Sequence, residues 1–116
     1  MSKLAVVLLS DMNEPVKVEM AMRFALVAQQ ERLLDDLRFY FFGPGVRVPG
    51  QILESGSELE KVLQQLLDSG MTTVACVYNA RQMGEAEHLQ KAEIEARAIG
   101  PELTRLVADG YQVMTF

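Results

Sequence analysis

The stretch Thr72-Thr-Val-Ala-Cys-Val77 is followed directly by Tyr78-Asn-Ala-Arg-Gln-Met-Gly84. The first segment is apolar and rich in β-branched residues, which predicts a buried strand, and the second predicts a short helix from about Asn79. A strand that runs straight into a helix is typical of an open α/β sheet, where ligands and nucleophiles lie at the carboxyl ends of strands. Cys76, the only cysteine of the chain, stands at this junction. The stretch therefore predicts both a fold class and a candidate site.

Further apolar segments alternate with helical ones along the rest of the chain. The expected strands are Leu4–Leu9, Leu37–Phe42, Thr72–Val77, Ala92–Ala96 and Tyr111–Phe116. The expected helices are Val18–Leu34, Glu58–Leu67, Asn79–Met83 and a last one from Gly100 to Asp109, with Val46–Leu53 and Gly84–Gln90 as loops. Two helix starts are assigned caps, Asp11 or Asn13 before the first helix and the box Ser57-Glu-Leu-Glu60 before the second.

This alternation implies right-handed crossovers between parallel strands. We expect one domain over residues 1–116, a three-layer α/β/α sandwich with a five-stranded, mostly parallel sheet. No internal repeat, linker or low-complexity tract interrupts it.

Composition excludes several classes of function. The net charge of −5, with 11 scattered Lys and Arg, argues against nucleic-acid binding. One cysteine excludes an intramolecular disulfide framework and a thiolate-rich metal site within one chain. We expect no metal or organic cofactor. The apolar run near the N-terminus is too short for a signal peptide or a membrane span. With seven Met and an unpaired thiol, the chain suits a reducing compartment, and we expect a cytoplasmic protein that binds no membrane.

The loops that follow the strands should share one edge of a parallel sheet. The candidate ligand-binding residues in these loops are Ser10, Asp11, Gly43, Pro44, Gly45, Tyr78 and Asn79. The glycine loop lacks the dinucleotide and Walker fingerprints, so it is either a tight turn or a place where the backbone approaches a ligand or the cysteine loop.

Cys76 and Arg81 are the candidate catalytic residues. The backbone N–H groups of a helical turn and the Arg81 guanidinium both favour a thiolate or a persulfide anion. The alternatives are a packed cysteine and a solvated helix arginine. His88, the only histidine, lies among polar residues and is interpreted as a solvated surface side chain.

Over nearly its whole length the chain resembles the DsrE/DsrF-like family, which includes small sulfur-relay subunits. The resemblance lies in Leu4–Leu9, in Leu37-Arg-Phe-Tyr-Phe-Phe-Gly-Pro-Gly-Val46, in the helix Glu58–Leu67, in Ser69-Gly-Met-Thr-Thr-Val-Ala-Cys76 and in Leu103–Phe116. The most specific part is a cysteine at a strand end followed by small residues, an arginine and a glycine, matched here by Cys76, Ala80, Arg81 and Gly84.

This resemblance implies that Cys76 accepts sulfane sulfur as a persulfide and passes it to a cysteine of another protein. It also implies a homo-oligomer, or a hetero-oligomer with related subunits, and donor and acceptor proteins as partners. Val77-Tyr-Asn79 is bulkier than the small residues that relay subunits carry there. The alternative is therefore a non-catalytic ligand-binding or assembly module of the same fold. The sequence leaves open whether the protein is an enzyme.

Overall fold

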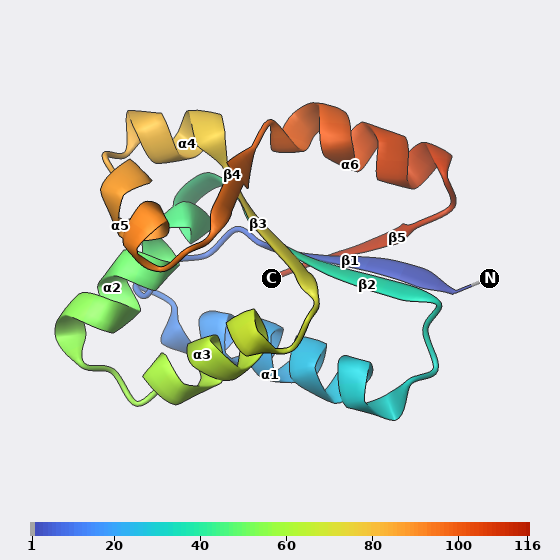
Figure 1. The fold of residues 1–116 in the computed structure, drawn as a ribbon, viewed down its shortest axis with the longest axis horizontal. Helices are drawn as coiled ribbons and strands as arrows, with labels where there is room; N and C mark the ends of the chain where they lie inside the picture. Colours follow the sequence, from blue (N-terminus) through green and yellow to red (C-terminus); the bar gives the residue numbers. More distant parts are fainter. Residues whose placement is uncertain (1) are drawn as a thin grey trace.

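The computed structural model describes residues 2–116 and shows an α/β fold with a five-stranded, all-parallel sheet flanked by helices (Figure 1). The strands are β1 (Lys3–Leu8), β2 (Asp36–Phe41), β3 (Thr72–Cys76), β4 (Glu95–Arg97) and β5 (Gln112–Thr115). Their spatial order is β4-β3-β2-β1-β5, and each neighbouring pair is parallel. The expected class and strand number are confirmed, and the sheet is parallel throughout.

The helices are α1 (Pro15–Glu31), α2 (Val48–Ser55), α3 (Glu60–Asp68), α4 (Val77–Gln82), α5 (Ala86–Lys91) and α6 (Ile99–Ala108), with a 3₁₀ helix, η1 (Gly43–Arg47). Helices α1 and α3 cover one face of the sheet, and α6 crosses the opposite face on its way from β4 to β5 (Figure 1). We call these the α1 face and the α6 face. No helix within residues 2–116 is long and apolar enough to cross a membrane.

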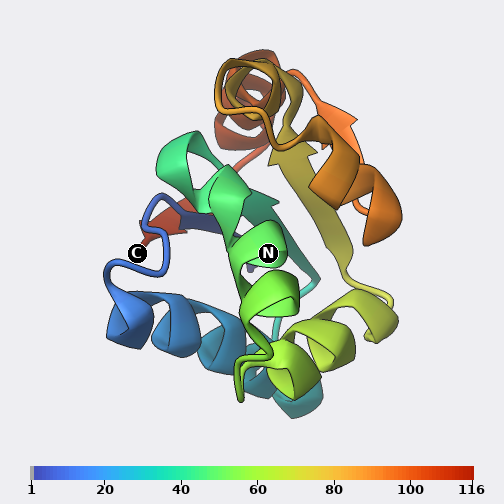
Figure 2. The ribbon, with the colours of Figure 1, turned by 90° about the vertical axis from the view of Figure 1, so that its left-hand side faces the viewer.

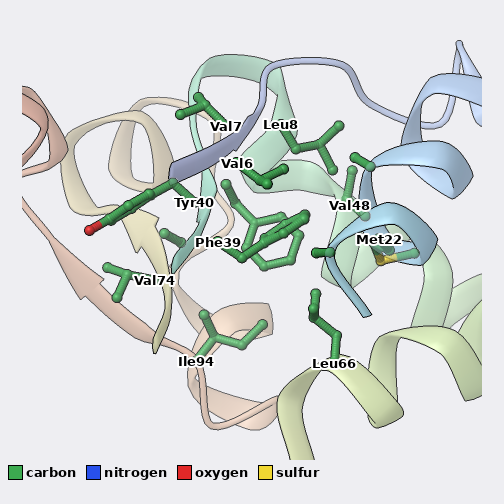
Figure 3. Close-up of a cluster of buried hydrophobic side chains, with 14 of the residues drawn as sticks. Val6, Val7, Leu8, Met22, Phe39, Tyr40, Val48, Leu66, Val74 and Ile94 are labelled. Atoms are coloured by element: carbon green, nitrogen blue, oxygen red, sulfur yellow. The ribbon is translucent and has the colours of Figure 1, made fainter. Parts of the chain in front are cut away.

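The two faces of the sheet differ in chemistry because side chains alternate along each strand. On the α1 face, Phe39 packs towards Met22 of α1 and Leu66 of α3, all of them fully buried (Figure 3). Tyr40 and Val74 point to the α6 face instead (Figure 3). The α1 face therefore holds the large apolar core, and the α6 face mixes apolar and polar groups.

Two expected loops are helical, so those predictions were wrong. The segment Val46–Leu53 contains the end of η1 and most of α2, whose Val48 and Ile52 are buried one helical turn apart. Pro49 and Gly50 hid this periodicity, because both residues usually mark turns. The segment Gly84–Gln90 contains most of α5, which buries only Leu89 and so shows no apolar repeat.

The expected helix caps and the fourth strand also needed correction. Ser57 does not cap α3 directly: its hydroxyl accepts a hydrogen bond from the Leu59 N–H at 3.1 Å, and the helix begins at Glu60. The strand expected over Ala92–Ala96 is β4, which starts only at Glu95. Glu93 has a φ of 59°, and this left-handed conformation prevents the extended backbone from starting earlier.

Candidate functional site

Cys76 is the last residue of β3 and immediately precedes α4. Its backbone is still extended, with φ of −72° and ψ of 118°. Its side chain is a free thiol, 3% exposed, within the buried cluster of the protein. The strand ends one residue earlier and the helix begins two residues earlier than the sequence predicts, and the thiol at the junction is buried.

The glycine loop, Gly43–Gly45, lies against α4 and the end of β1. The Gly43 N–H donates a hydrogen bond to Oδ1 of Asn79 in α4 at 2.9 Å. Gly45 lies so close to β1 that an added Cβ would come within 1.9 Å of the Leu8 carbonyl oxygen. The close backbone approach that these glycines allow therefore brings η1 against α4 and the end of β1 (Figure 2).

The loop after β1 is held in place by η1 and α2. Buried Asp11 accepts the Asn13 N–H at 2.9 Å and pairs with Arg47 at 3.3 Å. The Met12 N–H donates to Oε1 of Gln51 at 3.0 Å. Neither Asp11 nor Asn13 caps α1, whose N-cap residue is Glu14, because the Asp11 carboxylate closes a turn two residues on instead. The glycine loop and the loop after β1 therefore both make hydrogen bonds to other elements of the protein.

The remaining candidates lie nearer the surface. Ser10 donates its hydroxyl to Glu14 at 3.2 Å. Tyr78 is 59% exposed, and Arg81 is exposed and makes no ion pair with any residue between 2 and 116. Arg81 lines a hollow of about 290 Å³ formed with α5 and β4, and the lining does not include Cys76.

A different arginine lies beside Cys76. Arg97 of β4 is the register partner of Cys76, and paired residues of neighbouring strands point to the same face. Its Nη1 lies 3.2 Å from both carboxylate oxygens of buried Glu102 in α6, and its Nε donates to Glu95. Glu102 also accepts the Tyr40 hydroxyl at 2.5 Å. We call these three residues the Arg97–Glu102–Tyr40 network.

The network places the Arg97 guanidinium and the Glu102 carboxylate together on the α6 face. Burial and the hydrogen bond to Glu102 raise the pKa of Tyr40, so its hydroxyl stays protonated. Burial lowers the pKa of Arg97, but its hydrogen bonds to Glu95 and Glu102 outweigh burial and leave that pKa raised. This network was not predicted from the sequence, because Tyr40 lies inside an apolar run and Glu102 in an amphipathic helix.

His88 is not the free surface side chain that the sequence suggested. Its Nε2 lies 2.6 Å from Oε1 of Glu54 in α2, and its Nδ1 lies 3.0 Å from Oε1 of Glu85. The bond to Glu54 joins α5 to α2, and Gly50 makes room for the imidazole ring, since an added Cβ would lie 2.7 Å from Nδ1. Hydrogen bonds to Glu85 and Glu54 raise the pKa of His88. No group of three or more His, Cys, Asp or Glu side chains that could hold a metal ion occurs in the described part of the chain.

Comparison with known proteins supports the fold and adds no activity. No family model and no curated protein matches the chain. The conserved protein of unknown function BT1422 from Bacteroides thetaiotaomicron is similar in structure, with a TM-score of 0.78 and 18% identity over 97% of this chain and 94% of that one. The protein of unknown function MTH1491 from Methanobacterium thermoautotrophicum aligns with a TM-score of 0.70 and 16% identity over 100% of both chains.

Proposed function

We propose that this protein is a small DsrE-like sulfur carrier that holds a persulfide on Cys76. The observation that carries the proposal is the position of this cysteine, at the carboxyl end of an interior parallel strand and directly before a helix. That edge of an α/β sheet is where such folds place reactive groups. The spacing from Cys76 to Gly84 adds the resemblance to sulfur-relay subunits.

The chemistry requires only thiols. Cys76 loses its proton to solvent, and its thiolate attacks the outer sulfur of a donor persulfide. A new S–S bond forms on Cys76 while the donor S–S bond breaks, and the donor leaves as a thiolate that takes up a proton. An acceptor thiolate then attacks the outer sulfur on Cys76 in the same way, which returns the free cysteine. Sulfur changes hands without a net oxidant or reductant.

The Arg97–Glu102–Tyr40 network supplies charges on the face of the sheet to which Cys76 points. A neighbouring guanidinium favours an anionic sulfur, and a neighbouring carboxylate disfavours it. We therefore assign to Arg97 the stabilising role that the sequence suggested for Arg81. Arg97 acts as a positioning residue, since Glu95 and Glu102 hold its guanidinium.

The burial of Cys76 favours a second candidate function. At 3% exposure the thiol reaches a donor only if the elements that cover it move apart. If they do not, Cys76 is a packing residue and the protein is a non-catalytic module that binds a small ligand or assembles with other proteins. The two functions differ in whether the native thiol reacts.

One experiment separates these two functions. The folded protein is treated with inorganic polysulfide, and its intact mass is measured, with Cys76→Ser as the control that has no thiol. A carrier gains sulfur that a thiol reductant removes, and the control gains none. If the native protein keeps its mass while the denatured protein reacts, the packed-cysteine function is correct and the carrier proposal is wrong.

A further inference from the structure

Helices α4 and α5 and the segment of β4 line a hollow of about 290 Å³. These three elements contact one another, and Figure 1 shows them grouped at one end of the molecule. The buried part of the lining is apolar and consists of Ala80, Leu89 and Ile94, each at most 6% exposed. The two polar side chains of the lining are Arg81 of α4 and Gln90 of α5. The hollow therefore combines an apolar interior with one cation and one amide.

Backbone hydrogen bonds hold the walls of this hollow in place. The Ala80 C=O accepts the Glu85 N–H at 2.8 Å, which fixes the turn between α4 and α5. The Leu89 C=O accepts the Ile94 N–H at 2.9 Å, which fixes the chain between α5 and β4. His88 bonds α5 to α2 from the same helix. The hollow is thus formed without a ligand, as small-molecule sites usually are.

The guanidinium of Arg81 has no counter-charge within residues 2–116. Glu85 and Glu95 are adjacent in sequence to lining residues, but Glu85 bonds to His88 and Glu95 to Arg97. An unpaired guanidinium beside an apolar surface favours an anion, and its planar fork matches the two oxygens of a carboxylate. The lining holds a single cation, which balances the one charge of a carboxylate but not the two of a phosphate.

We propose that this hollow binds a short aliphatic monocarboxylate. The carboxylate pairs with Arg81, the Gln90 amide offers a further hydrogen bond, and the aliphatic body covers Leu89 and the apolar residues beside it. Ligand pockets have volumes of about 300–1,000 Å³, so a hollow at the lower limit accepts a short chain and not a fatty acid. The lining excludes Cys76, so this site does not depend on whether the thiol carries sulfur.

Three small probes test the chemistry of this site. The wild-type protein is titrated with isovalerate, acetate and isovaleramide, and backbone amide NMR shifts in α4, α5 and β4 are followed. Isovalerate is expected to bind saturably with a Kd on the order of 1 mM. Acetate lacks the aliphatic body and isovaleramide lacks the charge, so each is expected to bind at least about tenfold more weakly. Acetate binding as tightly as isovalerate would reduce the site to a surface ion pair and overturn the proposal.

Three variants test the residues. Arg81→Gln is expected to weaken isovalerate binding about tenfold, because it removes the cation. Ala86→Leu fills the hollow from α5 and is expected to abolish binding while Arg81 remains. Arg105→Gln is the matched control: Arg105 is an exposed arginine of α6 without an ion pair, it lies outside the hollow, and isovalerate affinity is expected to stay unchanged.

Circular dichroism checks that each variant is folded, and the wild-type titration stands even where a variant is not. A wild type whose shifts do not saturate would overturn the proposal. So would an Arg81→Gln variant that binds isovalerate like the wild type, or an Arg105→Gln variant that loses as much affinity as Arg81→Gln. The polysulfide experiment on Cys76 is separate, so failure of either proposal leaves the other in place.

Discussion

Gly45 shows how one residue fixes the geometry of the candidate site. Gly45 lies close to the Leu8 carbonyl, and this contact packs η1 against the end of β1. The same 3₁₀ helix carries the Gly43 amide that holds Asn79. A side chain at position 45 would therefore displace η1, which bonds to α4 just after Cys76.

We expect Gly45→Ala to lower the free energy of unfolding by about 1–3 kcal/mol, since the new methyl group meets backbone and cannot turn away. Gly100→Ala is the control, because a Cβ at Gly100, within α6, meets no atom within 4 Å. That substitution is expected to raise stability by about 0.4–1 kcal/mol through the unfolded state. Urea unfolding of both variants measures these differences, and equal stabilities would contradict the expectation.

The choice between two arginines is also made at the residue scale. Arg97→Gln removes the cation that is paired in register with Cys76 and leaves the Glu102 carboxylate uncompensated on the same face of the sheet, so we expect alkylation of Cys76 by iodoacetamide at neutral pH to slow about tenfold. Glu102→Gln is expected to speed the reaction. Arg81→Gln is the matched control and is expected to have no effect. Rates that fall with Arg81→Gln and not with Arg97→Gln would restore the assignment made from the sequence.

Among the elements, α2 and α5 are joined by His88 in a way that depends on its charge. Both ring nitrogens face carboxylate oxygens, from Glu54 and Glu85, and only an imidazolium donates two hydrogen bonds. Helix α2 follows η1 and helix α5 follows α4, and α4 begins directly after Cys76. The charge of His88 therefore affects the stability of the contact between α2 and α5.

The pKa of His88 is raised above its usual 6.5 by hydrogen bonds to Glu85 and Glu54. Its contribution to stability should therefore be complete below pH 6.5 and should disappear as the pH rises through the raised value. We expect the difference in thermal midpoint between the wild type and His88→Gln to shrink across that range. A difference that grows with pH would contradict this sign.

Gly50→Ala tests the same contact by geometry. The added Cβ displaces the His88 ring, so NMR titration should find the pKa of His88 closer to 6.5. Glycine inside a helix normally costs about 0.5–1 kcal/mol relative to alanine, so this glycine is explained by the close approach of His88. An unchanged titration of His88 would show that the ring does not need this space.

At the scale of the whole molecule, one buried cluster spans the sheet and its helices. Phe39 is fully buried at its centre, between β1, α1 and α3 (Figure 3). A shared core makes the layers depend on one another and favours a single unfolding transition.

Phe39→Ala is expected to lower the free energy of unfolding by about 3–5 kcal/mol and to shift the transitions followed by circular dichroism and by tyrosine fluorescence together. Leu33→Ala, at a position 78% exposed, should change stability by less than about 0.5 kcal/mol. Separate transitions for the two probes would show that the layers unfold independently.

Much of this architecture could be predicted from local pattern. The runs around Val6, Phe39 and Val74 are apolar in a way that only buried strands tolerate, and the helices between them repeat with helical spacing. Helices α2 and α5 could not be predicted, because Pro49, Gly50 and a single buried Leu89 give no usable period. The position of Cys76 at a strand end could also be predicted from the sequence, since it depends only on where the strand stops.

The sequence by itself determined the class of the fold, its five strands and the junction at which Cys76 lies, because these follow from periodicity within short windows. Tertiary structure alone decided which charged groups meet. Arg97 lies opposite Cys76 because β4 pairs with β3, and Glu102 bonds to Tyr40 because α6 crosses the sheet. The same crossing leaves β5 as an open edge beside β1. Such contacts join residues far apart in the chain, and strand order, which no local window contains, brings them together.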